Sequence, residues 1–293
     1  MELATAVPSP YLVPTDGRFD LAAASTAPPE DAPGKKANQE ALDAAVSRLA
    51  KLQDKLYADD RTSILLVFQA MDAAGKDGTI RAVLSGVNPQ GCQVFAFKSP
   101  SHEELEHDFL WRVNRALPER GRIGVWNRSH YEEVITVRAN PQFLVNQRLP
   151  SRPPSLAQLW TQRFESIVDA ERHWARNGTV ILKFFLNVSR DEQKERLLAR
   201  IDEEKGNWKF QLGDLEVRRQ WPQYMAAYQD ALAATSRPWA PWYCVPADNK
   251  PFMRRTVAEI VVATLERLEL RYPELSAEQK AQLGAARAQL EAD

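Results

Sequence analysis

A glycine–lysine pair follows a short apolar run in this sequence. The run Ser63-Ile-Leu-Leu-Val-Phe68 leads through a turn to Gly75-Lys76, where a helical pattern begins. A loop between a buried strand and a helix can point several backbone N–H groups at an anion, and a lysine adds positive charge for phosphate. The context therefore predicts a phosphate-binding loop. Its residues would be Ala73, Ala74, Gly75, Lys76, Asp77, Gly78 and Thr79.

The loop departs from the strict pattern G-x-x-x-x-G-K-[ST]. Ala70 stands in place of the first glycine, and Asp77 stands in place of the metal-binding hydroxyl, which Thr79 could supply two residues later. Asp72 lies inside the loop, and a carboxylate among phosphates is costly unless a cation lies between them, so Asp72 predicts Mg²⁺. The alternatives are an ordinary strand–turn–helix and an aspartate that caps the helix.

A second polar group follows the predicted strand 122–126. Because ligands bind at the carboxyl ends of strands in an open α/β sheet, the residues after Trp126 face the expected site. Arg128 could hold a phosphate and offset charge during transfer, although a surface salt bridge is the alternative. Glu132 and Glu133 could orient an acceptor nucleotide or a hydrated Mg²⁺, with Glu133 as a second metal ligand, or could lie in solvent.

Further cations lie beyond these two motifs. The charge-dense segment 200–213 has the character of a lid that closes over phosphates, with Arg200, Lys205 and Lys209 as candidate clamps. A solvated loop of mixed charge is the alternative. A third set of basic residues lies around the second and third strands, and the sequence leaves open whether they share one surface. This set consists of Lys98, Arg112, Arg115, Arg120 and Arg122.

Alternating strands and helices must position these groups. Apolar runs predict strands at 63–68, 94–97, 122–126, 179–186 and 242–245. Amphipathic patterns predict helices at 38–57, 76–84, 103–116, 156–176, 189–201, 214–234 and 252–271. The alternation indicates an α/β fold, a doubly wound parallel sheet flanked by helices. We expect an extended arm at 1–36, a catalytic domain at 37–273 and a C-terminal helix or tail at 274–293.

Composition excludes several other classes of protein. The 293 residues carry a net charge of −1, which argues against a non-specific nucleic-acid coat. No apolar stretch reaches the roughly 18 residues of a membrane span. The first residues lack a basic segment that leads into an apolar one, so we do not expect secretion. Two cysteines are too few for a disulfide framework, and with four histidines they make a structural zinc site improbable. A cytoplasmic protein without a membrane partner is expected.

Four motifs resemble the polyphosphate kinase 2 family, in order and across residues 35–270. They are Met71-Asp-Ala-Ala-Gly-Lys-Asp-Gly-Thr-Ile80, Asn127-Arg-Ser-His-Tyr-Glu132, Trp208-Lys209 with Gly213-Asp-Leu215, and Ala240-Pro-Trp-Tyr243. The resemblance implies a thymidylate-kinase-like P-loop kinase fold with a helical lid, and phosphoryl transfer between inorganic polyphosphate and nucleotides with Mg²⁺. It also implies a dimer or tetramer, and it favours Arg200 and Lys209 as lid residues.

One departure within these motifs concerns the acceptor. Many family members have an aspartate where this chain has Asn127. The asparagine resembles class III of the family, whose members act on nucleoside mono- and diphosphates. An amide ligates Mg²⁺ more weakly than a carboxylate, so the resemblance gives Asn127 a place at the nucleotide without a metal role.

Together these features predict a kinase that moves a phosphoryl group from polyphosphate to AMP, ADP or both. Lys76 and the loop would cradle phosphate, Asp72 would position Mg²⁺, and Arg128 with Arg200 would stabilise the transition state. The residues by themselves predict phosphoryl transfer, whereas polyphosphate comes from the resemblance. An ATP-dependent nucleoside monophosphate kinase and a non-catalytic nucleotide-binding regulator are the alternatives. Guanine nucleotides as acceptors are left open.

Overall fold

A five-stranded parallel sheet forms the centre of the molecule. The computed structural model describes residues 3–149, 155–208 and 210–292. Within them the strand order is β2-β3-β1-β4-β5, and every pairing is parallel. The strands are β1 (Ser63–Gln69), β2 (Cys92–Ala96), β3 (Ile123–Asn127), β4 (Thr179–Asn187) and β5 (Trp242–Pro246). The predicted parallel α/β sheet is confirmed.

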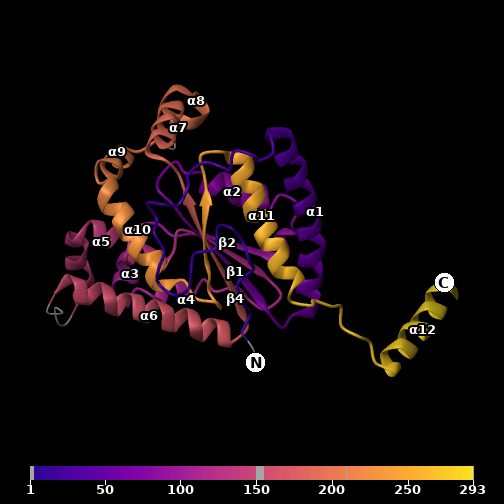
Figure 1. Ribbon diagram of the computed structural model, residues 1–293. Helices are drawn as coiled ribbons and strands as arrows, with labels where there is room; N and C mark the ends of the chain where they lie inside the picture. The colour runs from indigo at the N-terminus through magenta and orange to yellow at the C-terminus, as the bar shows by residue number, and fades with distance from the viewer. Residues whose placement is uncertain (1–2, 150–154, 209, 293) are drawn as a thin grey trace.

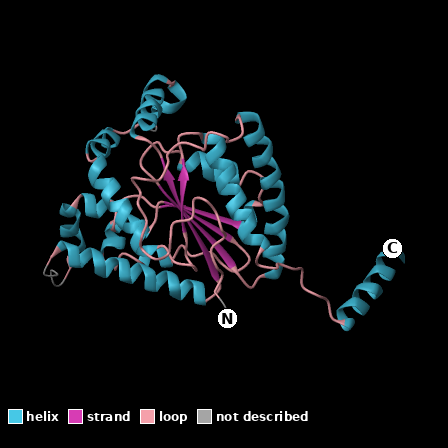
Figure 2. Ribbon diagram, in the orientation of Figure 1, coloured by secondary structure: helices cyan, strands magenta, loops and turns pink. Residues whose placement is uncertain are grey.

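Helices cover both faces of this sheet, as Figures 1 and 2 show. One layer contains α1 (Lys35–Asp59), α2 (Lys76–Val83) and α11 (Lys250–Glu266), and α11 contacts both of the others. The opposite layer contains α6 (Leu156–Arg176) and α10 (Trp221–Thr235). Because both faces are covered, all residues of β1 are buried, and its apolar run needs no alternation.

Short helices connect these layers. They are α3 (His102–Leu105), α4 (Trp111–Asn114), α5 (Thr136–Ala139), α7 (Arg190–Asp202), α8 (Glu204–Asn207) and α9 (Leu212–Arg219). Three 3₁₀ turns join them, η1 (Pro89–Gly91), η2 (His130–Glu133) and η3 (Pro141–Gln147). None of the helices in the part of the chain that the structure describes is long and apolar enough to span a bilayer.

Two predicted helices are interrupted. The segment 103–116 divides into α3 and α4, because the Asp108 carboxylate accepts a hydrogen bond from the Leu110 N–H at 2.8 Å and forms a turn. The segment 214–234 divides into α9 and α10 at Gln220. Pro222 lies in the first turn of α10, where its missing N–H costs nothing, and a helix interior would not tolerate it.

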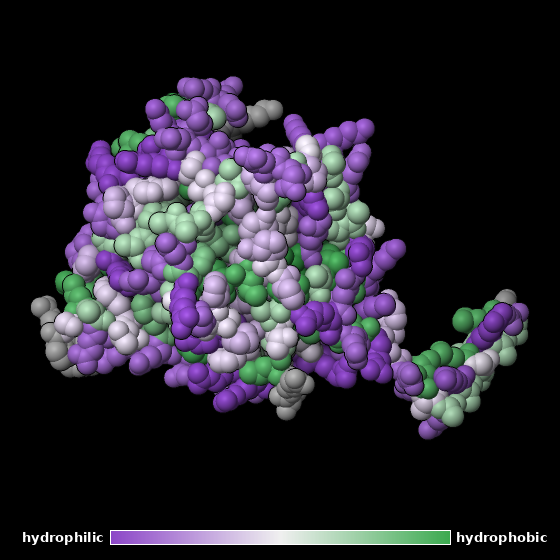
Figure 3. All heavy atoms as spheres, in the orientation of Figure 1, coloured by the Kyte–Doolittle hydropathy of each residue, from purple (hydrophilic) through white to green (hydrophobic). Residues whose placement is uncertain are grey.

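The two ends of the chain differ in their contacts with the body. The N-terminal arm is irregular, as expected, but it packs closely: Val13 is fully buried and Leu12 pairs with Tyr243 of β5. The C-terminal helix α12 (Ala277–Ala292) has no buried residue and projects away from the domain in Figure 1. Figure 3 shows that it presents both apolar and polar residues on its surface.

Candidate active site

The phosphate loop has the conformation that its position between β1 and α2 requires. Gly75 has φ of 112°, a region that favours glycine, and an added Cβ would lie 3.2 Å from Met253. The Lys76 ammonium donates to the Ala70 carbonyl at 2.8 Å, with the Met71 carbonyl at 3.4 Å. The lysine therefore lies over the loop itself, as a residue that binds phosphate there must.

The electrostatics of Lys76 also suit an anionic ligand. Burial, reinforced by the positive charge of Arg128, lowers the pKa of Lys76 to about 8. The carboxylates of Asp72 and Glu132 oppose this shift only in part. A phosphate placed beside the ammonium would favour its charged form.

Arg128 joins the loop to the turn after β3. Its guanidinium lies 2.5 Å from the Asp72 carboxylate and 3.4 Å from that of Glu132. The negative charge of Glu132, followed by that of Asp72, raises the pKa of Arg128 although burial opposes this. Since β1 and β3 are adjacent, residues 56 positions apart meet at one point. Arg128 and Asp72 lie together, as the site requires.

Asn127 forms a second connection between the same elements. Its amide nitrogen donates to the Asp77 carboxylate at 2.5 Å, so the end of β3 is tied to the first turn of α2. Thr79 points elsewhere. It is fully buried, and its hydroxyl donates to the Gly75 carbonyl at 3.0 Å. In this conformation the Thr79 hydroxyl faces the helix interior and not a metal. Gly78 packs against Arg254, whose guanidinium would lie 3.0 Å from an added Cβ.

The neighbouring glutamates Glu132 and Glu133 face different surroundings. Glu132 contacts Arg128 and accepts from the Thr136 hydroxyl at 2.6 Å. Glu133 is buried and pairs with Arg163 of α6 at 2.9 Å. It also lines a cavity of about 670 Å³ together with Phe109 and Arg112. Its carboxylate contacts Arg163 and Gln147, whereas Arg128 lies beside Asp72, so a metal ion held at Asp72 is not expected to include Glu133.

The additional basic residues do not form one surface. Lys98, Arg112 and Arg115 line a cavity of about 440 Å³ beside the carboxyl end of β2. Arg120 and Arg122 lie before β3, at the opposite end of the sheet, where Arg120 donates to the Arg61 carbonyl at 2.8 Å. The first three could border a ligand, but the last two lie away from the phosphate loop.

The segment predicted to form a lid brings a carboxylate that the sequence analysis did not assign. Arg200, in the last turn of α7, lies 3.6 Å from Asp214 of α9. Burial, and next the charge of Asp72, raises the pKa of Asp214. The motif Gly213-Asp-Leu215 was the available signal. Lys209 and the side chain of Lys205 lie outside the residues that the structure describes.

Behind the Arg128 turn lies a buried polar network that was not expected. Lys183 of β4 donates to the Tyr131 hydroxyl at 2.8 Å, the Glu171 carboxylate at 2.6 Å and the Thr235 carbonyl at 3.0 Å. His130 is buried beside Glu171, and burial lowers the pKa of His130. A lysine inside the most apolar strand was the only hint in the sequence. The network fixes the base of the turn.

Comparison with known proteins decides the family. A family model described as Polyphosphate kinase 2 (PPK2) matches residues 33–273. The chain belongs to the polyphosphate kinase 2 family. The resemblance drawn from four short motifs is thus confirmed across residues 33–273.

Two curated relatives and one solved structure illustrate this membership. The chain is 52% identical over 256 residues to an ADP-polyphosphate phosphotransferase of Rhodopseudomonas palustris, covering 87% of this chain and 89% of the relative. It is 45% identical over 268 residues to an AMP/ADP-polyphosphate phosphotransferase of Meiothermus ruber, covering 90% and 95%. The crystal structure of polyphosphate kinase 2 from Arthrobacter aurescens TC1 matches with a TM-score of 0.87 and 35% identity, covering 98% and 99%. The predicted P-loop kinase-like fold is confirmed.

Proposed function

We propose that this protein transfers a phosphoryl group from inorganic polyphosphate to AMP or ADP, which yields ADP or ATP. The proposal rests on one observation. Lys76, Asp72 and Arg128 lie together at the carboxyl ends of β1 and β3. Family membership and the names of the relatives favour polyphosphate over ATP as the donor. They also favour an enzyme over a regulator.

The residues act mainly by positioning and by charge. The loop N–H groups and Lys76 hold phosphate oxygens, and Arg128 offsets negative charge as the phosphoryl group moves between two in-line oxygens. A phosphate oxygen of the acceptor is already anionic, so the transfer needs no general base. Arg200, in the segment expected to act as a lid, closes over the phosphates and excludes water that would otherwise compete with the acceptor, and the family resemblance favours Lys209 in the same role.

The donor set at the loop fits Mg²⁺. Among the described residues, no group of three His, Cys, Asp or Glu side chains could hold a metal ion by itself. Mg²⁺ is usually held by one or two carboxylates together with substrate phosphates, and Asp72 and Glu132 supply two hard oxygen donors around Arg128. Asp72 would hold the ion, with Glu132 next to it. The bound ion would neutralise phosphate charge.

The cavity of about 670 Å³ beside Glu133 is the place for the acceptor nucleoside. It adjoins the Arg128 turn through Glu133 and offers an apolar ring, Phe109, and polar groups of Arg163 and Gln147. Adenine is the expected base, and the test below also includes guanine nucleotides.

The proposal also includes assembly of the protein into a dimer or tetramer, which light scattering would measure.

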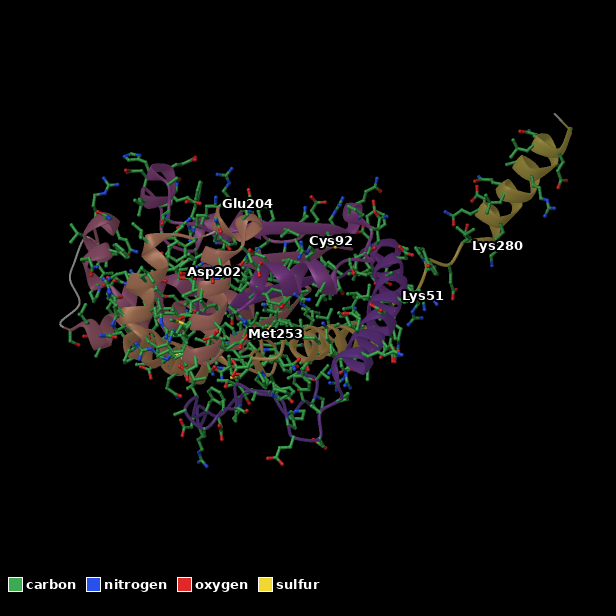
Figure 4. The ribbon with its side chains drawn as sticks, turned by 90° about the horizontal axis from the view of Figure 1, so that it is seen from above. Lys51, Cys92, Asp202, Glu204, Met253 and Lys280 are labelled. Carbon is green, nitrogen blue, oxygen red and sulfur yellow. The ribbon has the colours of Figure 1, made fainter. Side chains whose placement is uncertain are left out.

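A product assay tests the proposal. Purified protein with Mg²⁺ and polyphosphate is incubated with AMP, ADP, GMP or GDP in separate reactions, and the products are separated. We expect ADP and ATP from the adenine acceptors, and no transfer when ATP replaces polyphosphate as donor to AMP. Lys76→Ala should abolish most transfer, whereas Lys51→Ala, an exposed lysine of α1 labelled in Figure 4, should not. Transfer from ATP alone would contradict the proposal.

A further inference from the structure

One buried arginine of α7 contacts the phosphate loop from behind. Arg196 is 7% exposed, and its guanidinium donates to the Ala74 carbonyl at 2.6 Å and the Ala73 carbonyl at 3.3 Å. The other terminal nitrogen donates to the carbonyls of Ala247 at 2.6 Å and Asp248 at 3.3 Å, after β5. Its Nε contacts Glu192 at 2.7 Å. All three nitrogens of Arg196 thus face protein acceptors.

A second side chain of the same helix completes this contact. Gln193 is fully buried and donates to the Asp72 carbonyl at 3.0 Å. Three successive loop carbonyls, those of residues 72, 73 and 74, are therefore held by α7. We call Gln193 and Arg196 the α7 clasp.

The α7 clasp provides hydrogen-bond donors for the carbonyl groups that the loop turns outward. A loop that cradles phosphate must turn its N–H groups inward, so its carbonyl oxygens need partners on the outside. Ala73 has φ of 61°, a left-handed conformation that is unfavourable for a residue with a Cβ and must be imposed by its surroundings. In addition, Ala70 replaces the first glycine of the strict loop pattern. Side-chain contacts therefore hold a loop that has fewer glycines to shape it.

The same helix leads to the lid. Arg196 and Arg200 are one helical turn apart on α7, and α8 begins directly after it. Figure 4 labels Asp202 and Glu204 at this junction. A change in the position of α7 would therefore move the loop carbonyls and the lid cation together.

We propose that Arg196 is a positioning residue that keeps the phosphate loop in its anion-binding conformation and couples the loop to α7, the helix that carries Arg200. It acts through the backbone of the loop without touching the phosphate. The proposal rests on the proposed function, because it assumes that the loop binds phosphate. A lysine cannot replace this arginine, since one ammonium cannot bridge two pairs of carbonyls in a planar fork.

Tripolyphosphate binding, measured by calorimetry without an acceptor nucleotide, tests the clasp. We compare Arg196→Lys and Arg196→Met with Lys194→Met, an exposed lysine on the same helix. Both Arg196 variants should bind roughly tenfold or more weakly, which equals the loss of about 1.4 kcal/mol, and Lys194→Met should bind like wild type. Hydrogen exchange at the amides of residues 73–79 should speed up in the Arg196 variants only. Wild-type binding and exchange in Arg196→Lys would overturn the proposal.

Further measurements distinguish a positioning role of Arg196 from a general loss of stability. They also distinguish failure of this proposal from failure of the proposed function. In Arg196→Ala, added guanidinium ion should restore part of the binding, whereas sodium chloride at equal ionic strength should not. A variant that melts earlier but, while folded, binds tripolyphosphate like wild type contradicts a positioning role. If wild type binds tripolyphosphate but transfers no phosphoryl group, the proposed function fails, and the binding and exchange data still decide the role of Arg196.

Discussion

The phosphate loop and the lid are built differently although both are expected to contact the same phosphates. In the loop, Ala74 and Thr79 are fully buried, and the backbone is held by the α7 clasp. In the lid, α9 has no buried residue, and Leu212 is 79% exposed. The loop is fixed by the core, whereas α9, in the segment expected to act as a lid, lies exposed at the surface.

This difference indicates separate roles for the loop and the lid in the proposed reaction. Groups that stabilise a transition state gain most when they are already oriented, because no reorganisation is needed during the reaction. A lid must open for substrate and product, and such elements come from the less stable parts of a fold. Loop variants should therefore affect chemistry strongly, and lid variants more weakly.

The largest effect is expected in the loop. Lys76→Ala and Asp72→Asn should each lower turnover by roughly 10²–10³, or about 3–4 kcal/mol, because a contact made in the transition state is lost. The fold should remain, since both residues lie at the edge of the core. Steady-state kinetics with circular dichroism measures both. Turnover close to wild type in either variant would remove that residue from the site.

Lid variants should have a smaller effect on turnover. Arg200→Ala should lower it by roughly tenfold to a hundredfold, which corresponds to one charge-assisted contact of about 1.5–3 kcal/mol. Lys209→Ala is expected to act in the same direction. The free energy of unfolding of the Arg200 variant should change by less than about 0.5 kcal/mol, because Arg200 lies partly exposed outside the core and such substitutions rarely cost more. Higher salt should weaken polyphosphate use by screening. Unfolding of the Arg200 variant would show instead that α7 needs this residue structurally.

The pH dependence of polyphosphate binding should reveal the loop lysine. The pKa of Lys76 is lowered to about 8 in the free protein, and bound phosphate favours the charged lysine. Affinity should thus be constant below pH 8 and fall by up to about tenfold per pH unit above it, where binding requires proton uptake. Calorimetry in buffers of different ionisation enthalpy detects that proton. Flat affinity between pH 8 and 9.5 would contradict the assignment.

The smallest difference is expected between the two neighbouring glutamates of η2, Glu132 and Glu133. Glu132 contacts Arg128, whereas Glu133 contacts Arg163. Glu132→Ala should reduce use of ADP more than use of AMP by about tenfold in the ratio of kcat/KM, because Glu132 would help to hold the Mg²⁺ that accompanies the extra phosphate of the longer acceptor. Glu133→Ala should raise KM for both acceptors by disturbing the cavity. Equal losses for both acceptors in Glu132→Ala would refute its role in acceptor choice.

Local sequence features predicted the elements that carry the site. Continuous apolar runs identified the strands, and Gly75-Lys76 between a strand and a helix identified the loop, because backbone propensity and burial act over a few neighbouring residues. The position of Arg128 after a buried strand was sufficient to predict that it lies at the carboxyl end of the sheet, where it contacts Asp72 of the loop. The break at Pro222 and the turn at Asp108 were also local, and the prediction gave them too little weight.

Only the tertiary structure decided which side chains meet. The divergence of Glu132 and Glu133 depends on a 3₁₀ turn whose partners, Arg128 and Arg163, come from separate elements. Arg120 and Arg122 lie away from the site because they come before the amino end of β3, whereas the site lies at the carboxyl ends of the strands.

Arg196 reaches a loop 122 residues earlier in the chain because β4 lies next to β1. Such contacts follow from strand order and direction. No periodicity within a short window of sequence contains that information, because the residues concerned become neighbours only when the sheet is assembled.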